Sequence, residues 1–409
     1  MTATQSRFAD LARWQAILIA SFTLAVILGG YACQMHNRFL PNVMPVSAAP
    51  AGQTATAADE ADAGDLALYR TITLRMANGA PYYATVVERH RKSSYPLRPF
   101  FTVRLPTLAY IGSTLGLVGA RVLLAALLLL SAVVWWRRLK LVTDPTTLQP
   151  VICILAISTG TFSFAATPNL VVSHEVWAAT LMAISWAVWG GFSNKADDKS
   201  LWSWLPSVVF AAAAVMIRET ALPFVLLMGA FAVWHRQWRQ TVAWVAVVAL
   251  FAAYLAVHAS YVLAATTAGD LASPGWTNLA GWPFFVLAMH GSTGLRILPE
   301  WMAAIFVPLT MLGWASWRPL GRSDTGMFGF LLFTGYALIF MVLGRPDNWY
   351  WGLLLSSNFL MGLMFAPQAI IDLIGVIRRM PINGGVKSGG APATDRQWPT
   401  TSSRPAAAR

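Results

Sequence analysis

This sequence is dominated by long apolar runs that carry almost no charge, and those runs limit its possible folds more than any other feature. The first runs from Trp14 to Ala32, and nine more follow at about 120–136, 148–167, 176–191, 201–217, 221–234, 241–262, 301–317, 326–344 and 352–376. Each lies near the roughly 20 residues that a helix needs to cross a bilayer. Charged residues make up only 11% of the 409 residues, whereas soluble domains carry about 25%. The sequence therefore predicts an all-α polytopic membrane protein with about ten transmembrane helices.

This composition also excludes several classes of protein. A cytosolic enzyme, a disordered chain and a fibrous protein are excluded by the apolar content of 56%. A β-barrel is disfavoured because its strands read as short segments of alternating polarity. The two cysteines, Cys33 and Cys153, have no disulfide or metal-ligand spacing.

The basic residues of the short loops predict the orientation, because cytoplasmic loops are enriched in Lys and Arg. With the N-terminal head inside, the short outer loops contain Arg218, Arg296 and Arg345. The short inner loops contain Arg137, Arg138, Lys140, Lys195, Lys199, Arg236, Arg239, Arg318 and Arg322. This bias predicts cytoplasmic N- and C-termini. The net charge of +12 then reflects topology and anionic lipid rather than a nucleic-acid partner.

Residues 1–380 are interpreted as a single transmembrane domain, and residues 381–409, rich in Gly, Pro, Ser and Ala, as a disordered cytoplasmic tail. Two regions of the domain are not spans. They are a large first external loop at 33–119 and a second external region at 263–300, in which the apolar stretch 282–289 is too short to cross.

The first external loop is expected to carry helices that lie on the outer surface. Its stretch from Pro41 to Gly64 is rich in Ala, Pro and Thr, as is typical of a linker. From Asp65 to Asn78-Gly79 the apolar side chains recur at helical spacing, which predicts an amphipathic surface helix; they are Leu66, Tyr69, Ile72, Leu74 and Met76. A second such element is expected near 105–119, where Gly112, Gly116 and Ala120 permit close helix packing.

Mixed charges gather at span ends on the predicted outer face. They are His174-Glu175, Arg218-Glu219, Glu300, and Arg345 with Asp347. Charged groups at this depth are costly and tend to line a wet cavity or to pair, so we expect one polar cavity open to the outside. Most of these residues, and two other candidates of the same face, Asp65 and the aromatic residues 349–351, also have a simpler structural interpretation. Asp65 suits a helix N-cap, Glu175 suits a helix N-terminus, Arg218-Glu219 suits a local ion pair, 345–348 suits a turn, and Trp349–Trp351 suits an interfacial aromatic belt.

Three short stretches of the first loop resemble one known family. They are GDLALY at 64–69, NGAPYY at 78–83 and YPLRP at 95–99. Together they are similar to the first external loop of bacterial members of the GT-C superfamily of integral-membrane glycosyltransferases. The likeness rests on sequence motifs in the first 140 residues and only on the predicted membrane topology in the remainder. It implies an enzyme of the bacterial cytoplasmic (inner) membrane that transfers a sugar from a polyprenyl-phosphate donor to a glycan, lipid or protein acceptor on the outer face.

The resemblance also implies roles for individual residues. Asp65 is expected to be the base that deprotonates the acceptor hydroxyl. The donor phosphate is expected to meet Arg98, Arg104, Arg218, Arg345 and His174. The sugar or acceptor is expected to meet Tyr69, Glu175, Glu219, Asp347, Asn348, Trp349 and Tyr350. Leu66 and Ala67 follow Asp65, so there is no clean acidic pair for a divalent metal; such a metal stays an open alternative, and no cofactor is predicted.

Two other functions remain open at this stage. One is a transporter or flippase of a lipid-linked or neutral substrate, and the other is a polymerase or ligase of surface polysaccharide. Mid-span ionisable residues are nearly absent, which disfavours a proton-coupled transporter. Motifs for nucleotide binding, zinc proteolysis and serine hydrolysis are missing.

The topology can be tested with reporter fusions. A reporter placed after Arg379 should report the cytoplasm, and one inserted near Thr54 should report the exterior, because the inner loops hold the excess of basic residues. A cytoplasmic signal at Thr54 would overturn every inference about an outer face.

Overall fold

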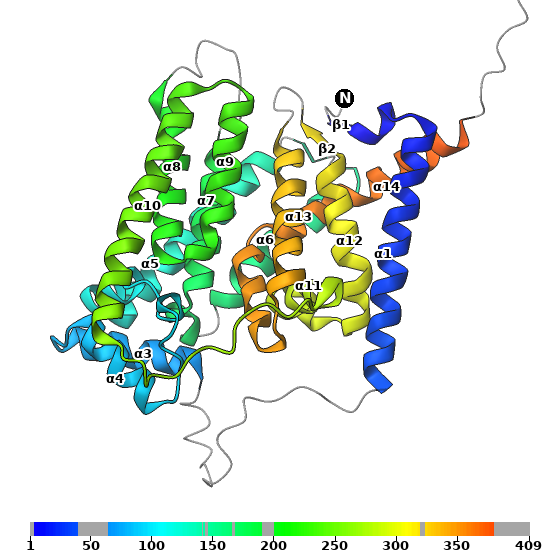
Figure 1. Cartoon of the computed structure of the whole chain (residues 1–409). Coiled ribbons are helices and arrows are strands. Elements are labelled where there is room, and N and C mark those ends of the chain that lie inside the picture. The colour runs from blue at the N-terminus through cyan, green and yellow to red at the C-terminus, as the bar shows by residue number, and fades with distance from the viewer. Residues whose placement is uncertain are drawn as a thin grey trace, which may run out of the picture.

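The computed structural model describes residues 4–39, 64–140, 142–143, 146–165, 168–189, 200–319 and 324–379. Most of the expected linker and the expected tail at 381–409 lie outside these ranges. The described chain is mostly helical (Figure 1). Its α-helices are α1 (Arg13–Phe39), α3 (Asp65–Ala77), α4 (Tyr82–Lys92), α5 (Thr107–Leu139), α6 (Gln149–Ala165), α7 (His174–Val188), α8 (Leu205–Ile217), α9 (Leu222–Trp234), α10 (Trp238–Ala265), α11 (Gly281–Ser292), α12 (Glu300–Ser316), α13 (Thr325–Leu343) and α14 (Ala366–Arg378).

Shorter elements connect these helices. The 3-10 turns are η1 (Arg7–Asp10), η2 (Phe100–Thr102), η3 (Pro168–Val172), η5 (Leu201–Ser203), η6 (Glu219–Ala221), η7 (Gly294–Ile297), η8 (Pro346–Leu355) and η9 (Phe359–Met364). Strands β1 (Thr4–Ser6) and β2 (Trp317–Pro319) form one antiparallel pair, which ties the N-terminal segment to the end of α12.

Four stretches are long and apolar enough to cross a membrane by length and composition. They are Arg13–Met35, Phe100–Leu139, Trp238–Ala265 and Thr325–Leu343. The apolar helices within 149–158, 205–217 and 219–234 are shorter. The helical class expected from the sequence is therefore observed, and each expected span except the last coincides with a helix, but ten spans are not confirmed.

The last expected span, 352–376, is not one continuous helix. It comprises the last four residues of η8, then η9, and then most of the 13-residue helix α14. Glycines let this segment run against neighbouring backbones, since a Cβ on Gly352 would overlap the carbonyl oxygen of Ala288 and one on Gly362 would overlap that of Thr310. Residues 352–362 are all buried. Irregular backbone at membrane depth is tolerated only where protein surrounds it or a cavity hydrates it, and here protein surrounds it.

The predicted surface helix of the first loop is present as α3. It ends at Ala77, directly before the Asn78-Gly79 pair that was expected to close it, and Gly79 has a positive φ of 89°. Leu68, Ile72 and Met76 form its buried face, whereas Leu74, which was expected on that face, is 43% exposed. Helices α3 and α4 lie at the end of the bundle away from the N-terminus (Figure 1).

The second expected surface element is present as the first part of α5, and a break at Gly116 separates it from the rest of that helix. Gly112 permits close packing as predicted, because its missing Cβ leaves room for the side chain of Thr73 in α3. Gly116 has a different role from the one expected. Its φ of 68° and ψ of 163° break the helix and redirect α5, so the segment beside α3 and the apolar segment beyond it point in different directions.

Substitution at Gly313 should test the packing of the irregular segment. A Cβ there would overlap the carbonyl of Gly362 and crowd the backbone nitrogen of Ala366. Gly313→Ala should therefore lower the free energy of unfolding by roughly 1–3 kcal/mol or more, measured by thermal denaturation in detergent. Gly335→Ala in α13 is the matched control, because nothing lies within 4 Å of its added Cβ. Equal stability of the two variants would contradict the backbone contact.

Candidate active site

A cluster of ionisable and phenolic side chains lies where five segments meet, at the same end of the bundle as α3 and α4. The segments are the start of α3, residues 103–106 before α5, the start of α7, the junction between α8 and α9, and η8. They contribute Tyr69, Arg104, His174, Glu175, Arg218, Glu219 and Tyr350. All seven were expected from the sequence to serve one site.

Arg218 is the most deeply buried charge of this cluster, with 1% exposure. Helix α8 ends at Ile217 and the backbone of Arg218 is extended, with φ −140° and ψ 113°. Its Nε lies 3.0 Å from Oε1 of Glu175, and its Nη1 donates to Oε1 of Glu219 at 2.5 Å. A buried charge is costly unless it is paired, and here one guanidinium holds two carboxylates from different elements.

Helix α7 is fixed at both ends. At its N-terminal end Glu175, 5% exposed, pairs with Arg218. At its C-terminal end Arg138 of α5 donates to the carbonyl oxygens of Trp186, Ala187 and Trp189, which the helix itself leaves without partners. The position of the Glu175 carboxylate therefore follows from two arginines at opposite ends of one helix.

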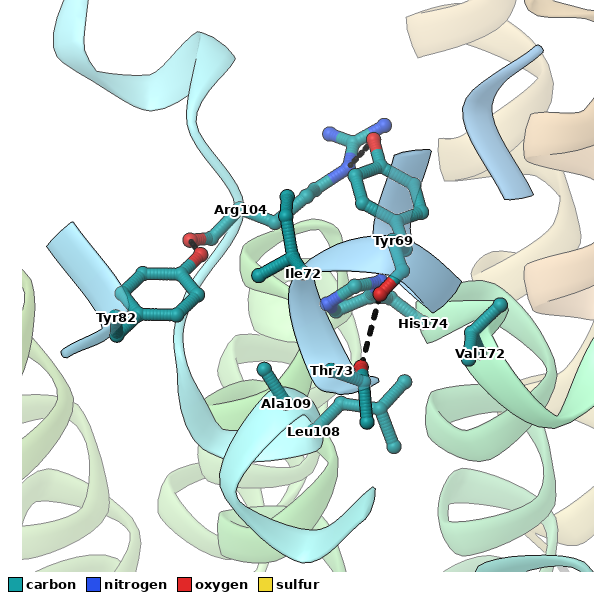
Figure 2. Close-up of a pocket in the computed structure, with 9 residues that line it drawn as sticks. All are labelled: Tyr69, Ile72, Thr73, Tyr82, Arg104, Leu108, Ala109, Val172 and His174. Atoms are coloured by element: carbon teal, nitrogen blue, oxygen red, sulfur yellow. Dashed lines mark hydrogen bonds between the residues drawn. The ribbon is translucent and has the colours of Figure 1, made fainter. Parts of the chain in front are cut away.

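Arg104 is held less tightly than Arg218. Its Nη2 lies 3.8 Å from Glu175 and its Nη1 lies 3.8 Å from Glu219. Its Nε donates to the Tyr69 hydroxyl at 3.1 Å, and Nη2 donates to the Tyr350 hydroxyl at 3.3 Å. The Tyr82 hydroxyl donates to its backbone carbonyl at 2.6 Å, as Figure 2 shows. Arg104 is thus more loosely paired than Arg218 and, with 13% side-chain exposure against 2%, more accessible to an anion.

The two phenols beside Arg104 can donate as well as accept. Burial raises the pKa of Tyr69 and of Tyr350 above the ordinary range, which keeps both groups protonated. Each hydroxyl oxygen accepts from Arg104 and retains its own proton. A phosphate oxygen beside Arg104 would therefore meet one guanidinium and two hydroxyl donors.

His174 lines a small pocket under α3 together with Tyr69 and Arg104 (Figure 2). Its ring packs edge-on against Tyr69 at 5.1 Å, and it is 4% exposed. Burial desolvates a cationic imidazole at this position and two guanidinium groups repel it, whereas the Glu175 carboxylate attracts it. Burial is the largest of these effects and favours the neutral ring, and the expected contact of His174 with the donor phosphate stays a prediction.

Asp65 is the first residue of α3 and not its N-cap. The N-cap position belongs to Gly64, with φ 105° and no side-chain cap. The Asp65 carboxylate instead lies beside Tyr95, since burial and this carboxylate together raise the pKa of the Tyr95 phenol. The sequence analysis did not assign Tyr95 to the site, although the Tyr-Pro pair at 95–96 was part of the family resemblance.

The remaining residues that were expected at the site make their contacts with other parts of the molecule. Arg98 donates to the carbonyl oxygen of Asp270 at 2.9 Å. Arg345 donates to the carbonyl of Gly275 at 3.1 Å and pairs with Asp347. Asn348 is buried, and Trp349 packs over Gly291. Both arginines therefore hold the segment 266–280 rather than a shared anion site.

No group of three or more His, Cys, Asp or Glu side chains that could hold a metal ion occurs in the part of the chain that the structure describes. The carboxylates of the cluster face arginines instead. Comparisons of the chain with protein-family models, with curated proteins and with solved structures gave no match.

Arg218→Met should mainly affect folding. It leaves the buried Glu175 carboxylate without its close partner, and breaking a buried pair in this way costs about 3–5 kcal/mol. The control is Arg75→Met, whose partner Glu88 is largely exposed, so that the expected cost is about 0–1 kcal/mol. Thermal denaturation of both purified variants would measure the difference. A stable Arg218→Met that binds ligand poorly would restore Arg218 to the anion-binding group.

Proposed function

We propose that this protein is a membrane glycosyltransferase that moves a sugar from a polyprenyl-phosphate donor to an acceptor hydroxyl on the outer face of a bacterial cytoplasmic membrane. The observation that supports it best is the arrangement around Arg104. A guanidinium with spare donors lies beside two phenols, and one of them, Tyr69, is on the same helix as Asp65. This combination offers an anion-binding group and a carboxylate base at the end of a membrane-suited helical bundle.

The chemistry follows from these groups. The donor phosphate would lie against Arg104 and the hydroxyls of Tyr69 and Tyr350. Asp65 would take the proton of the acceptor hydroxyl, whose oxygen attacks the anomeric carbon. The bond between that carbon and the phosphate oxygen breaks, and the electron pair leaves with the polyprenyl phosphate. Charge-assisted hydrogen bonds from Arg104 stabilise this leaving group.

The carboxylates of Glu175 and Glu219 complete the site as acceptors for sugar hydroxyls. Arg218 fixes both, so neither needs to reorganise when a ligand binds. Glu219, at 26% side-chain exposure, is the more accessible of the two. The polar face that they present favours a hydroxyl-rich substrate.

Asp65→Asn tests the base directly. Asn cannot accept the proton, and loss of a general base typically costs 10²–10⁴-fold in rate. The side chain does not cap α3, so the melting temperature should stay close to that of the wild type. Transfer from a panel of polyprenyl-phosphate sugars would be measured with purified protein. Wild-type turnover by Asp65→Asn would move the search for the base to Glu175 and Glu219.

Arg104→Gln tests donor recognition. The charge-assisted contact contributes on the order of 1.5–3 kcal/mol, so binding of decaprenyl phosphate should weaken by roughly 10- to 150-fold. The control is Arg75→Gln, which removes an arginine paired with Glu88 on the outer helices α3 and α4. Equal affinity of the two variants would exclude Arg104 as the phosphate ligand.

One observation favours transport as a second candidate function. Discontinuous segments buried among helices occur at the substrate sites of transporters, and η8 and η9 form such a segment here. Movement of a fluorescent lipid-linked sugar across proteoliposomes, without sugar transfer, would support this alternative over a glycosyltransferase.

A further inference from the structure

Residues 266–280 form a strap that joins α10 to α11. In Figure 1 this segment crosses the end of the bundle that carries α3 and α4. It contains no helix, yet it is held by hydrogen bonds near both of its ends. Those two anchors lie on different parts of the molecule.

The first anchor joins the strap to the first external loop. Arg91 of α4 binds Asp270 with two bonds, Nε to Oδ1 at 2.6 Å and Nη2 to Oδ2 at 2.8 Å. The backbone nitrogen of Leu97 donates to Leu271 at 2.9 Å, and that of Ser273 donates to Arg98 at 2.7 Å. Asp270 is 7% exposed and also accepts from Thr267, so it pins this end of the strap.

The second anchor joins the strap to the residues that precede η8. The backbone nitrogens of Asn278 and Leu279 both donate to the carbonyl of Val342, at 3.1 and 3.2 Å. The Asn278 amide donates to Gly344 at 3.1 Å, and Arg345 donates to Gly275. Four bonds therefore fix the start of η8 to the strap.

Arg104 and Tyr350 are hydrogen-bonded to each other, and each of them lies a few residues after one of the two anchors. Leu97 and Arg98 precede Arg104, and Val342 to Arg345 precede Tyr350. The 3.3 Å hydrogen bond between Arg104 and Tyr350 joins the same two parts that the strap joins. After the second anchor the strap leads directly into α11, which packs on η8 through Gly291 and Trp349.

We propose that the strap sets the position of Tyr350 against Arg104, and that Asp270 is the positioning residue that pins it. The role in ligand binding rests on the proposed function, whereas the mechanical role does not. Asp270 touches neither reacting group. It acts through the strap on η8, and thereby on a hydroxyl that would meet the donor phosphate.

The experiment compares wild type, Asp270→Asn and Arg91→Gln in phosphatidylcholine nanodiscs. Arg91→Gln removes the same ion pair from its half-exposed side, and it serves if Asp270→Asn folds poorly. Hydrogen–deuterium exchange would be measured over 266–280 and 346–355, and binding of decaprenyl phosphate would be measured in parallel. Arg75→Gln is the matched control, since it breaks an arginine–carboxylate pair on α3 and α4 that does not touch the strap.

Both strap variants should exchange faster over 266–280 and also over 346–355, and should bind decaprenyl phosphate at least about fivefold more weakly. Arg75→Gln should behave as wild type in both measurements. Faster exchange confined to 266–280, with unchanged exchange in η8, would overturn the proposal. If the wild type does not bind decaprenyl phosphate, the proposed function fails, and exchange over 346–355 still decides the role of the strap.

Discussion

The pairing of Arg218 with Glu175 and Glu219 is the interaction on which the rest of the site depends. A guanidinium that is almost fully buried needs close carboxylates, because the cost of desolvating it is several kcal/mol. The two glutamates come from α7 and from the turn after α8, so satisfying one charge fixes two helical segments relative to each other. It also leaves these carboxylates only loosely paired with Arg104, at 3.8 Å. Arg218 thus organises the site, and Arg104 is the more accessible of the two to a ligand.

The contrast between Arg218 and Arg104 shows which features of the fold and of the site could be predicted from the sequence and which could not. The apolar runs predicted where helices lie, and the spacing from Leu66 to Met76 predicted α3. The charges at the predicted span ends, together with the family resemblance, identified seven side chains that do come together. What the sequence could not separate is a closely paired, buried arginine from a more loosely paired one. Arg98, Arg104, Arg218 and Arg345 look alike in a loop, and only the folded chain shows that the first and last hold backbone carbonyls of the strap. The broken segment after Gly344 was missed for a similar reason. Its composition suits a helix, and the glycine contacts that favour a 3-10 path are tertiary.

The two candidate functions place different demands on the same architecture. Transfer requires a carboxylate, an anion-binding group and an acceptor to be held in one geometry, which a preorganised ion network favours. Transport requires two arrangements of similar free energy that expose the site alternately. The ion pair at one end of α7, the hydrogen bonds at its other end, and the strap between the first loop and η8 restrain relative motion of these elements. These restraints agree better with catalysis at a fixed site.

The irregular path of 346–365 has a consequence for how the protein is made. An α-helix can enter hydrocarbon alone, because it satisfies its own backbone, but a run of 3-10 turns and bends cannot do so cheaply. This segment needs the backbones of α11 and α12 beside it, and both precede it in the chain. During synthesis these partners therefore emerge from the ribosome first and can already be folded when the segment arrives. The order of segments in the sequence thus favours correct assembly. A rearranged gene that encodes 346–365 before α11 would produce this segment before its packing partners exist.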